Sequence, residues 1–231
     1  VRISFEENQL GGVEAVRITD NGHGLHRDDA ARVFSNLGGS WKRSGQQSLV
    51  RRRVLHGQYG KGRFRAFSLG QRAVWDTVFE SEGEHWRYWI TGDAAQPSRF
   101  LLSPAAPAGD MACGMTVSIE NPYTAVDLLR GVKATEELTA IFAPYLRQYP
   151  DVHIIYDNVP IDPANAELHV TEYDLGELVM QEGERAATHL TVVEWRQPGR
   201  RGEHLCDAEG FARHAALPRL HFRGFSYTAY L

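Results

Sequence analysis

The chain has 231 residues, 42% hydrophobic and 10% aromatic, which is enough for one large domain or two modest ones with their own cores. A formal net charge of −4 argues against a protein whose whole surface is specialised for nucleic acid, and no apolar run reaches the roughly 18 residues of a membrane helix. Cys113 and Cys206 are too few for a disulfide framework, so we expect free thiols in a reducing compartment, with the cytoplasm as the default location.

Two strands are predicted at the start of the chain, over residues 1–6 and 13–19, where apolar and polar residues alternate. The second strand delivers Asp20 and the glycines of Asp20-Asn21-Gly22-His23-Gly24. A helix is predicted next, over residues 26–37, because its apolar positions have helical spacing and acidic residues lie in its first turn.

Residues 38–60 form a polar, glycine-rich stretch without a clear period, as is typical of a functional lid or a disordered segment. This stretch carries the basic run Arg51-Arg52-Arg53, which is either a solvated part of the lid or a nucleic-acid patch. It leads into the second glycine cluster, Gly57-Gln58-Tyr59-Gly60-Lys61-Gly62, and then into a helix predicted over residues 63–69.

The rest of the chain is predicted to be mainly β-strand. Strands are expected over residues 73–79, 85–90, 98–102, 114–119, 152–156, 159–161, 168–175, 187–195 and 202–206. A helix is expected over residues 125–149, kinked at Pro144, and hairpin turns are expected at Asp157-Asn158 and at residues 196–202. The fold class is therefore α+β: residues 1–150 form a sandwich with helices on one face of a mixed, mostly antiparallel sheet, and residues 151–231 begin a second, β-rich domain.

The two glycine clusters together suit a nucleotide. Asp20, at the end of a strand, can accept a hydrogen bond from the exocyclic amine of a base, while Gly22 and Gly24 allow close backbone approach. Gly57, Gly60 and Gly62 precede a helix whose amino end would attract phosphates, with Lys61 as an additional charge. The six residues from Gly57 to Gly62 are the candidate phosphate loop. A turn cap at Asp20 and a solvated loop lysine at Lys61 are the alternatives.

Four segments of the chain resemble the GHKL (Bergerat-fold) ATPases. They are Asp20 to Leu25, Leu37-Gly38-Gly39-Ser40-Trp41-Lys42, Gly57 to Gly62, and Gly114-Met115-Thr116-Val117. The residue sequence of the second glycine cluster most resembles that of the branch containing MORC, MutL and the ninety-kilodalton heat-shock chaperone. Residues 151–231 more weakly resemble the transducer domain of that branch.

The resemblance implies a role for each matching residue. Asp20 would bind the adenine amino group, Gly22 and Gly24 would shape the pocket, and Thr116 would join the same water network from the opposing strand. The candidate phosphate loop comprises Gly57, Gln58, Tyr59, Gly60, Lys61 and Gly62. Ser40 and Lys42 would begin the ATP lid.

The family normally places a helix before the first strand, carrying the general-base Glu and an Asn that ligates Mg²⁺. This chain begins at Val1, already within a strand pattern and without an initiator Met. We therefore expect the catalytic residue and the metal ligand to lie upstream of Val1 in a longer parent protein. We also expect this fragment to bind ATP weakly and to be inactive.

The expected function is that of an ATP-binding and ATP-hydrolysing switch, in which lid closure over ATP and Mg²⁺ promotes formation of a homodimer. One alternative is a nucleotide-sensing module that does not hydrolyse ATP. Another is a nucleic-acid remodelling or defence factor of the MORC or MutL kind, which would be nuclear if it were a eukaryotic MORC-like protein.

Overall fold

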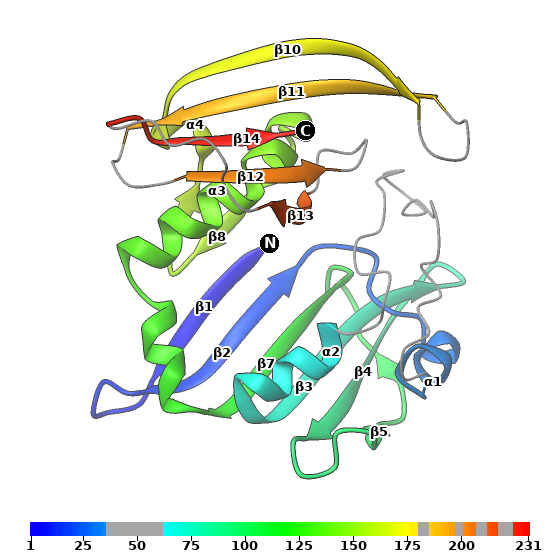
Figure 1. The fold of residues 1–231 in the computed structure, drawn as a ribbon. Coiled ribbons are helices and arrows are strands. Elements are labelled where there is room, and N and C mark those ends of the chain that lie inside the picture. The colour runs from blue at the N-terminus through cyan, green and yellow to red at the C-terminus, as the bar shows by residue number, and fades with distance from the viewer. Residues whose placement is uncertain (36–61, 180–184, 197–200, 207–211, 217–223) are drawn as a thin grey trace. The chain divides into compact units, whose positions relative to one another are not determined.

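The computed structural model describes residues 1–35, 62–179, 185–196, 201–206, 212–216 and 224–231 (Figure 1). The chain divides into two compact units. The first contains Val1–Gly131 and Ile154–Val159, and the second contains Val132–His153 and Pro160–Leu231. The assignment of ATP binding to residues 1–150 and of a transducer-like role to residues 151–231 stays a prediction. No described helix combines the length and the apolar character that crossing a membrane requires.

A mixed, mostly antiparallel sheet forms the first unit, as expected from the sequence. Its strands are β1 (Arg2–Glu7), β2 (Val13–Asp20), β3 (Gly70–Ser81), β4 (Glu84–Asp93), β5 (Phe100–Leu102), β6 (Ala106–Pro107), β7 (Gly114–Pro122) and β8 (Ile154–Tyr156). The sheet continues into β9 (Val159–Ile161), of which Pro160 and Ile161 belong to the second unit. Their order is β5-β4-β3-β7-β2-β1-β8-β9, with β6 also paired to β4. β1 and β8 run parallel, whereas β1 with β2, β2 with β7, β7 with β3, β3 with β4, and β4 with both β5 and β6 run antiparallel.

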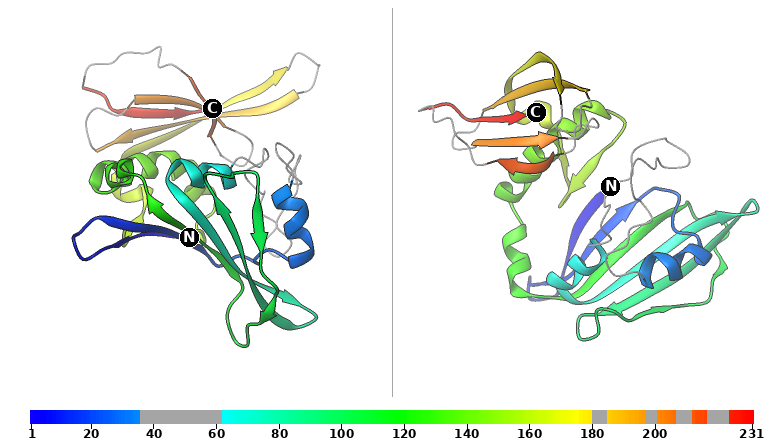
Figure 2. Two further views of the ribbon diagram at one scale, coloured as in Figure 1. Left: turned by 90° about the horizontal axis from the view of Figure 1, so that it is seen from below. Right: turned by 45° about the vertical axis from the view of Figure 1, so that its right-hand side comes forward.

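Short helices pack on one face of this sheet (Figures 1 and 2). They are α1 (Arg27–Ser35), α2 (Gly62–Arg65) and two 3-10 helices, η1 (Ala66–Ser68) and η2 (Thr124–Leu129). Ala30 and Phe34 of α1 join Trp75, Ile90 and Ile119 of the strands in a single core cluster. This burial follows from the apolar alternation along β3, β4 and β7, which gives the sheet one apolar face.

The helix predicted over residues 125–149 is wrong in its bounds. The chain forms η2, breaks at Arg130 and Gly131, and then forms α3 (Val132–Gln148) as part of the second unit. Gly131 has a φ of +95°, which is outside helical geometry and accounts for the break. α3 continues through position 144, and the kink expected at Pro144 stays a prediction.

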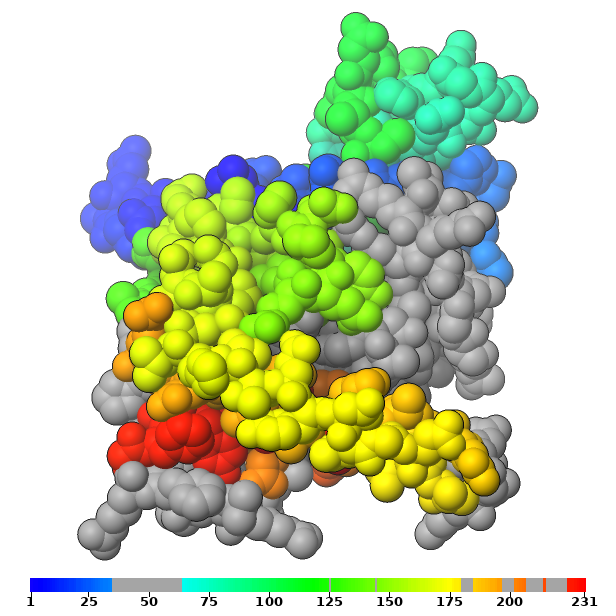
Figure 3. All heavy atoms as spheres, turned by 90° about the horizontal axis from the view of Figure 1, so that it is seen from above, coloured from blue at the N-terminus to red at the C-terminus, as the bar shows by residue number. Residues whose placement is uncertain are grey.

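The second unit is a five-stranded sheet packed against α3. Its other elements are α4 (Pro163–Ala166), β10 (Glu167–Val179), β11 (Arg185–Trp195), β12 (Arg201–Cys206), β13 (Ala212–Ala216) and β14 (Tyr227–Tyr230). Ala140 and Ala143 of α3 contact Val193, Trp195 and Tyr230 of the sheet in one core cluster. β10 is an edge strand, and most of its side chains are exposed (Figure 3).

Of the two predicted hairpins, one is confirmed and one is wrong. β8 and β9 are neighbours joined through Asp157 and Asn158, whose φ values of 45° and 66° are those of a tight hairpin turn. β11 and β12 are not neighbours, because the sheet order is β10-β11-β14-β12-β13. β14 pairs with both of them, so residues 196–202 connect two strands that flank a third.

Candidate functional site

The turn after β2 carries the candidate adenine site. Val16 and Ile18 of β2 join the core, so Asp20, two residues further along the strand, projects from the same helix-covered face. Its Oδ1 accepts a hydrogen bond from the Gly22 N–H at 2.8 Å. The carboxylate therefore caps its own turn with one oxygen, while Oδ2 has no hydrogen-bond partner among the described residues.

Gly24 holds this turn against the centre of the sheet. Its φ is +69°, and a Cβ there would overlap the carbonyl oxygen of Val78 in β3. The next residue, Leu25, donates its N–H to the Thr77 Oγ1 at 2.9 Å and accepts from the Tyr88 hydroxyl at 3.0 Å. Glycine is thus required at position 24 for both conformation and space.

Thr77 and Tyr88 are residues of the site region that the sequence did not single out. Both are fully buried, and burial raises the pKa of Tyr88 far above its ordinary range. The Tyr88 hydroxyl consequently stays protonated as a donor to the turn. These two residues can be identified only when the pairing of the strands is known. That pairing brings the turn after β2 onto β3 and β4, although Leu25 and Thr77 are 52 positions apart in the sequence.

Thr116 does not share a face with Asp20. In the antiparallel register, Asp20 lies opposite Met115, whereas Thr116 lies opposite Thr19, and the two threonine hydroxyl oxygens are 3.1 Å apart. Since neighbouring residues of a strand point to opposite faces, Thr116 projects from the face that lacks Asp20. The expectation that Thr116 joins the water network of Asp20 needs correction: Met115 and Thr77 are the residues in register with Asp20 on that face.

Most other residues expected in the site lie outside the described part of the chain. These are Ser40, Lys42, Arg51, Arg52, Arg53, Gly57, Gln58, Tyr59, Gly60 and Lys61. Gly62 is described as the first residue of α2. Their roles at the phosphates and in the lid stay predictions.

Within the described residues, His, Cys, Asp and Glu side chains do not gather into a group that could hold a metal ion. The binding of Mg²⁺ by this chain stays a prediction.

Comparisons with known proteins bear on the fold of the chain. Residues 1–108 match the family model described as histidine kinase-, DNA gyrase B- and HSP90-like ATPase. The structure is similar to the ATPase region of Saccharomyces cerevisiae topoisomerase II bound to ICRF-187, with a TM-score of 0.50 and 7% sequence identity. That similarity covers 88% of this chain and 55% of the other, so the chain spans about half the length of this structure.

No curated protein matches the sequence. The family match and the structural similarity support the fold of a GHKL ATPase, with an α+β architecture. They do not distinguish the branches of MORC, MutL and the ninety-kilodalton heat-shock chaperone from one another.

Proposed function

We propose that this chain binds ATP, with the adenine amino group donating a hydrogen bond to Asp20. The observation that carries the proposal is the state of this carboxylate. Its Oδ1 is fixed by the Gly22 N–H at 2.8 Å, and its Oδ2 is without a hydrogen-bond partner among the described residues. A strand-end carboxylate that is oriented but half satisfied suits a ligand that offers one N–H.

The surroundings of Asp20 favour a nucleotide base over a hydrated ion as its ligand. Met115 lies in register with Asp20 and packs against the apolar core. The contacts of Gly24, Thr77 and Tyr88 hold the turn in place without a ligand, so little conformational entropy is lost on binding. Asp20, Gly22 and Gly24 would bind the adenine, and the candidate phosphate loop, Gly57 to Gly62, would take the phosphates.

The proposal extends to an ATP-driven switch in the parent protein. ATP with Mg²⁺ would order the lid that contains Ser40 and Lys42, and the closed lid would favour a homodimer; hydrolysis would reverse both changes. Support for this extension is the family match over residues 1–108, whose description names ATPases. No observation on the described residues favours the nucleic-acid reading, which stays a prediction based on Arg51, Arg52 and Arg53.

The test compares two nucleotides on two variants. ATP carries an exocyclic amine where inosine triphosphate carries a carbonyl oxygen, so only ATP can donate to Asp20. Calorimetry should show ATP binding about tenfold or more tightly than inosine triphosphate, in line with a hydrogen bond to a charged group. In Asp20→Asn the preference should disappear, because the amide can keep the turn but can also donate to the inosine carbonyl.

Asp110→Asn is the matched control, since Asp110 is an exposed carboxylate in the connection before β7. It should retain the wild-type preference for ATP. Equal affinities of the wild-type chain for the two nucleotides, or an unchanged preference in Asp20→Asn, would refute the assignment of Asp20.

A further inference from the structure

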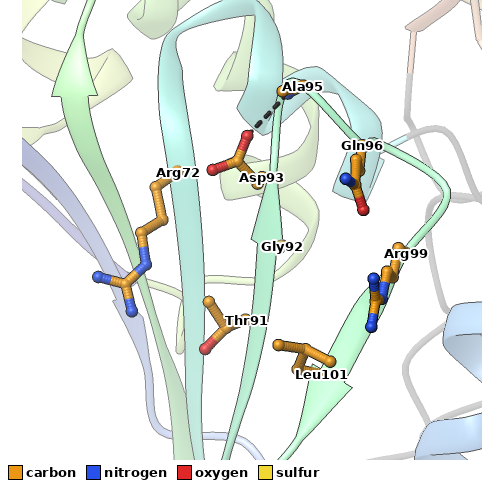
Figure 4. Close-up of a pocket in the computed structure, with 8 residues that line it drawn as sticks. All are labelled: Arg72, Thr91, Gly92, Asp93, Ala95, Gln96, Arg99 and Leu101. Atoms are coloured by element: carbon orange, nitrogen blue, oxygen red, sulfur yellow. Dashed lines mark hydrogen bonds between the residues drawn. The ribbon is translucent and has the colours of Figure 1, made fainter.

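A hollow lies in the first unit, at the end of β3 and β4 remote from the turn after β2. It encloses about 550 Å³ and is lined by Arg72, Thr91, Gly92, Asp93, Ala95, Gln96, Arg99 and Leu101 (Figure 4). Arg72 lies five residues before Thr77 on β3, about 16 Å away at the rise of a strand. The odd difference in position also puts the two side chains on opposite faces of the sheet, so this pocket is separate from the candidate adenine site.

The wall of the pocket is built by a loop that needs no ligand to hold it. Asp93 Oδ1 accepts from the Ala95 N–H at 2.8 Å, and the Ala94 N–H donates to the Gln71 carbonyl at 2.7 Å. The Arg99 N–H closes the loop by donating to the Gln96 carbonyl at 2.9 Å. The pocket is thus preorganised, as ligand sites usually are.

The floor of the pocket is tightly packed at Gly92. A Cβ at this position would lie 2.7 Å from the Cζ of Phe67 and 2.8 Å from the Cε1 of Phe100. Beside the floor, Leu101 is 60% exposed and supplies an apolar wall. The shape therefore combines a backbone floor with one apolar side and leaves the remaining sides to polar groups.

The polar groups are mainly hydrogen-bond donors that lack partners. Arg99, Gln96 and Thr91 have no side-chain hydrogen bond or ion pair within the described ranges, and Arg99 and Gln96 lie across from Thr91 in Figure 4. Arg72, on the other side of Thr91, is engaged by Glu120 through one nitrogen at 2.9 Å. The one carboxylate in the lining, Asp93, already accepts from Ala95.

Two arginines of this sheet, unlike Arg99, are paired with carboxylates. Arg17 contacts Glu6 at 2.5 Å, and Arg87 contacts Asp76 at 2.5 Å. Arg2 of β1, like Arg99, has no ion pair within the described residues, but of the two only Arg99 lines the hollow. An arginine fork of this kind recognises carboxylate and phosphate groups.

We propose that this pocket, the Arg99 pocket, binds a small organic anion: a carboxylate or phosphate group attached to a compact apolar body. The anionic group is held by Arg99 with Gln96 and Thr91, and the apolar body lies on Leu101. Anion binding in this pocket does not depend on ATP binding at the turn after β2. An experiment can therefore refute either proposal without affecting the other.

The test is an NMR titration of the isotope-labelled chain with phenyl phosphate, benzoate and uncharged phenol. We expect saturable shifts of the Gln96 side-chain amide and of the Thr91 and Arg99 signals with either anion, at least about tenfold weaker in Arg99→Ala. Arg17→Ala, which removes an arginine on β2, should bind as the wild type does. The ranking of the two anions then shows which anionic group the pocket prefers.

Three results would overturn the proposal. They are the absence of saturable shifts with both anions, equal affinity in Arg99→Ala, and phenol binding as tightly as phenyl phosphate. Arg99 is exposed, so its replacement should leave the fold intact, and an unchanged backbone spectrum of Arg99→Ala would verify this.

Discussion

Gly24 and Gly83 show how the same backbone conformation can carry different costs. Both have positive φ, +69° and +81°, but a Cβ would overlap the Val78 carbonyl at Gly24 and would meet nothing within 4 Å at Gly83. We predict that Gly83→Ala lowers the free energy of unfolding by about 1 kcal/mol, through backbone strain alone. Gly24→Ala should lower it by about 3 kcal/mol, because steric overlap is added to the strain. Urea unfolding followed by tryptophan fluorescence measures both, and equal losses would show that the turn has room to move.

At the scale of the element, we expect a histidine of β12, His204, to make the second unit sensitive to acid. The ring of His204 stacks on Tyr230 with centroids 5.5 Å apart, and burial lowers the pKa of His204. The unfolded chain, with an ordinary histidine pKa near 6.5, therefore takes up a proton at a higher pH than the folded chain does. Stability should be unaffected well above this value and should fall as the pH drops below it, towards the folded pKa. We predict that the loss of urea resistance between about pH 7.5 and pH 5.5 is smaller in His204→Phe than in the wild type. The control is His189→Phe, at an exposed site on β11, which should show the wild-type loss. The same loss in both variants would contradict the prediction.

Elements set by local signals were predictable from the sequence, and those set by distant pairing were not. The Asp157-Asn158 turn has residues that tolerate positive φ, so the β8–β9 hairpin could be predicted from a few positions. The insertion of β14 between β11 and β12 depends on pairing with the far end of the chain, which no local pattern encodes. At the candidate site, Asp20 and Gly24 were predicted from residue type and spacing, and their role in binding stays a prediction. The face from which Thr116 projects and the contact of Thr77 with the turn both depend on the strand register. A shift of the register by one residue moves each side chain of a strand to the opposite face of the sheet.

At the scale of the whole molecule, the first unit borrows a strand from later in the chain. The Ile155 N–H donates to the Val1 carbonyl and the Asp157 N–H to the Ile3 carbonyl, both at 2.9 Å. Tyr156 packs edge-on against Phe5, and its hydroxyl donates to the Leu129 carbonyl at 2.5 Å. We predict that Tyr156→Ala destabilises the first unit by about 3 kcal/mol, which corresponds to roughly hundredfold faster hydrogen exchange at the amides of β1. Tyr149→Ala, in the second unit, should leave these amides unchanged, and similar exchange in the two variants would refute the role of Tyr156.

This borrowed strand also sets the order in which the protein can be completed during synthesis. β8 follows α3 in the chain, and α3 belongs to the core of the second unit. Until residues 154–159 have left the ribosome, β1 has an open edge that can pair with other chains. The first unit therefore cannot complete its sheet until residues 154–159 are synthesised, and these residues follow α3 of the second unit in the chain. Slow translation just before Ile154 should lengthen the time during which the nascent chain is prone to aggregate.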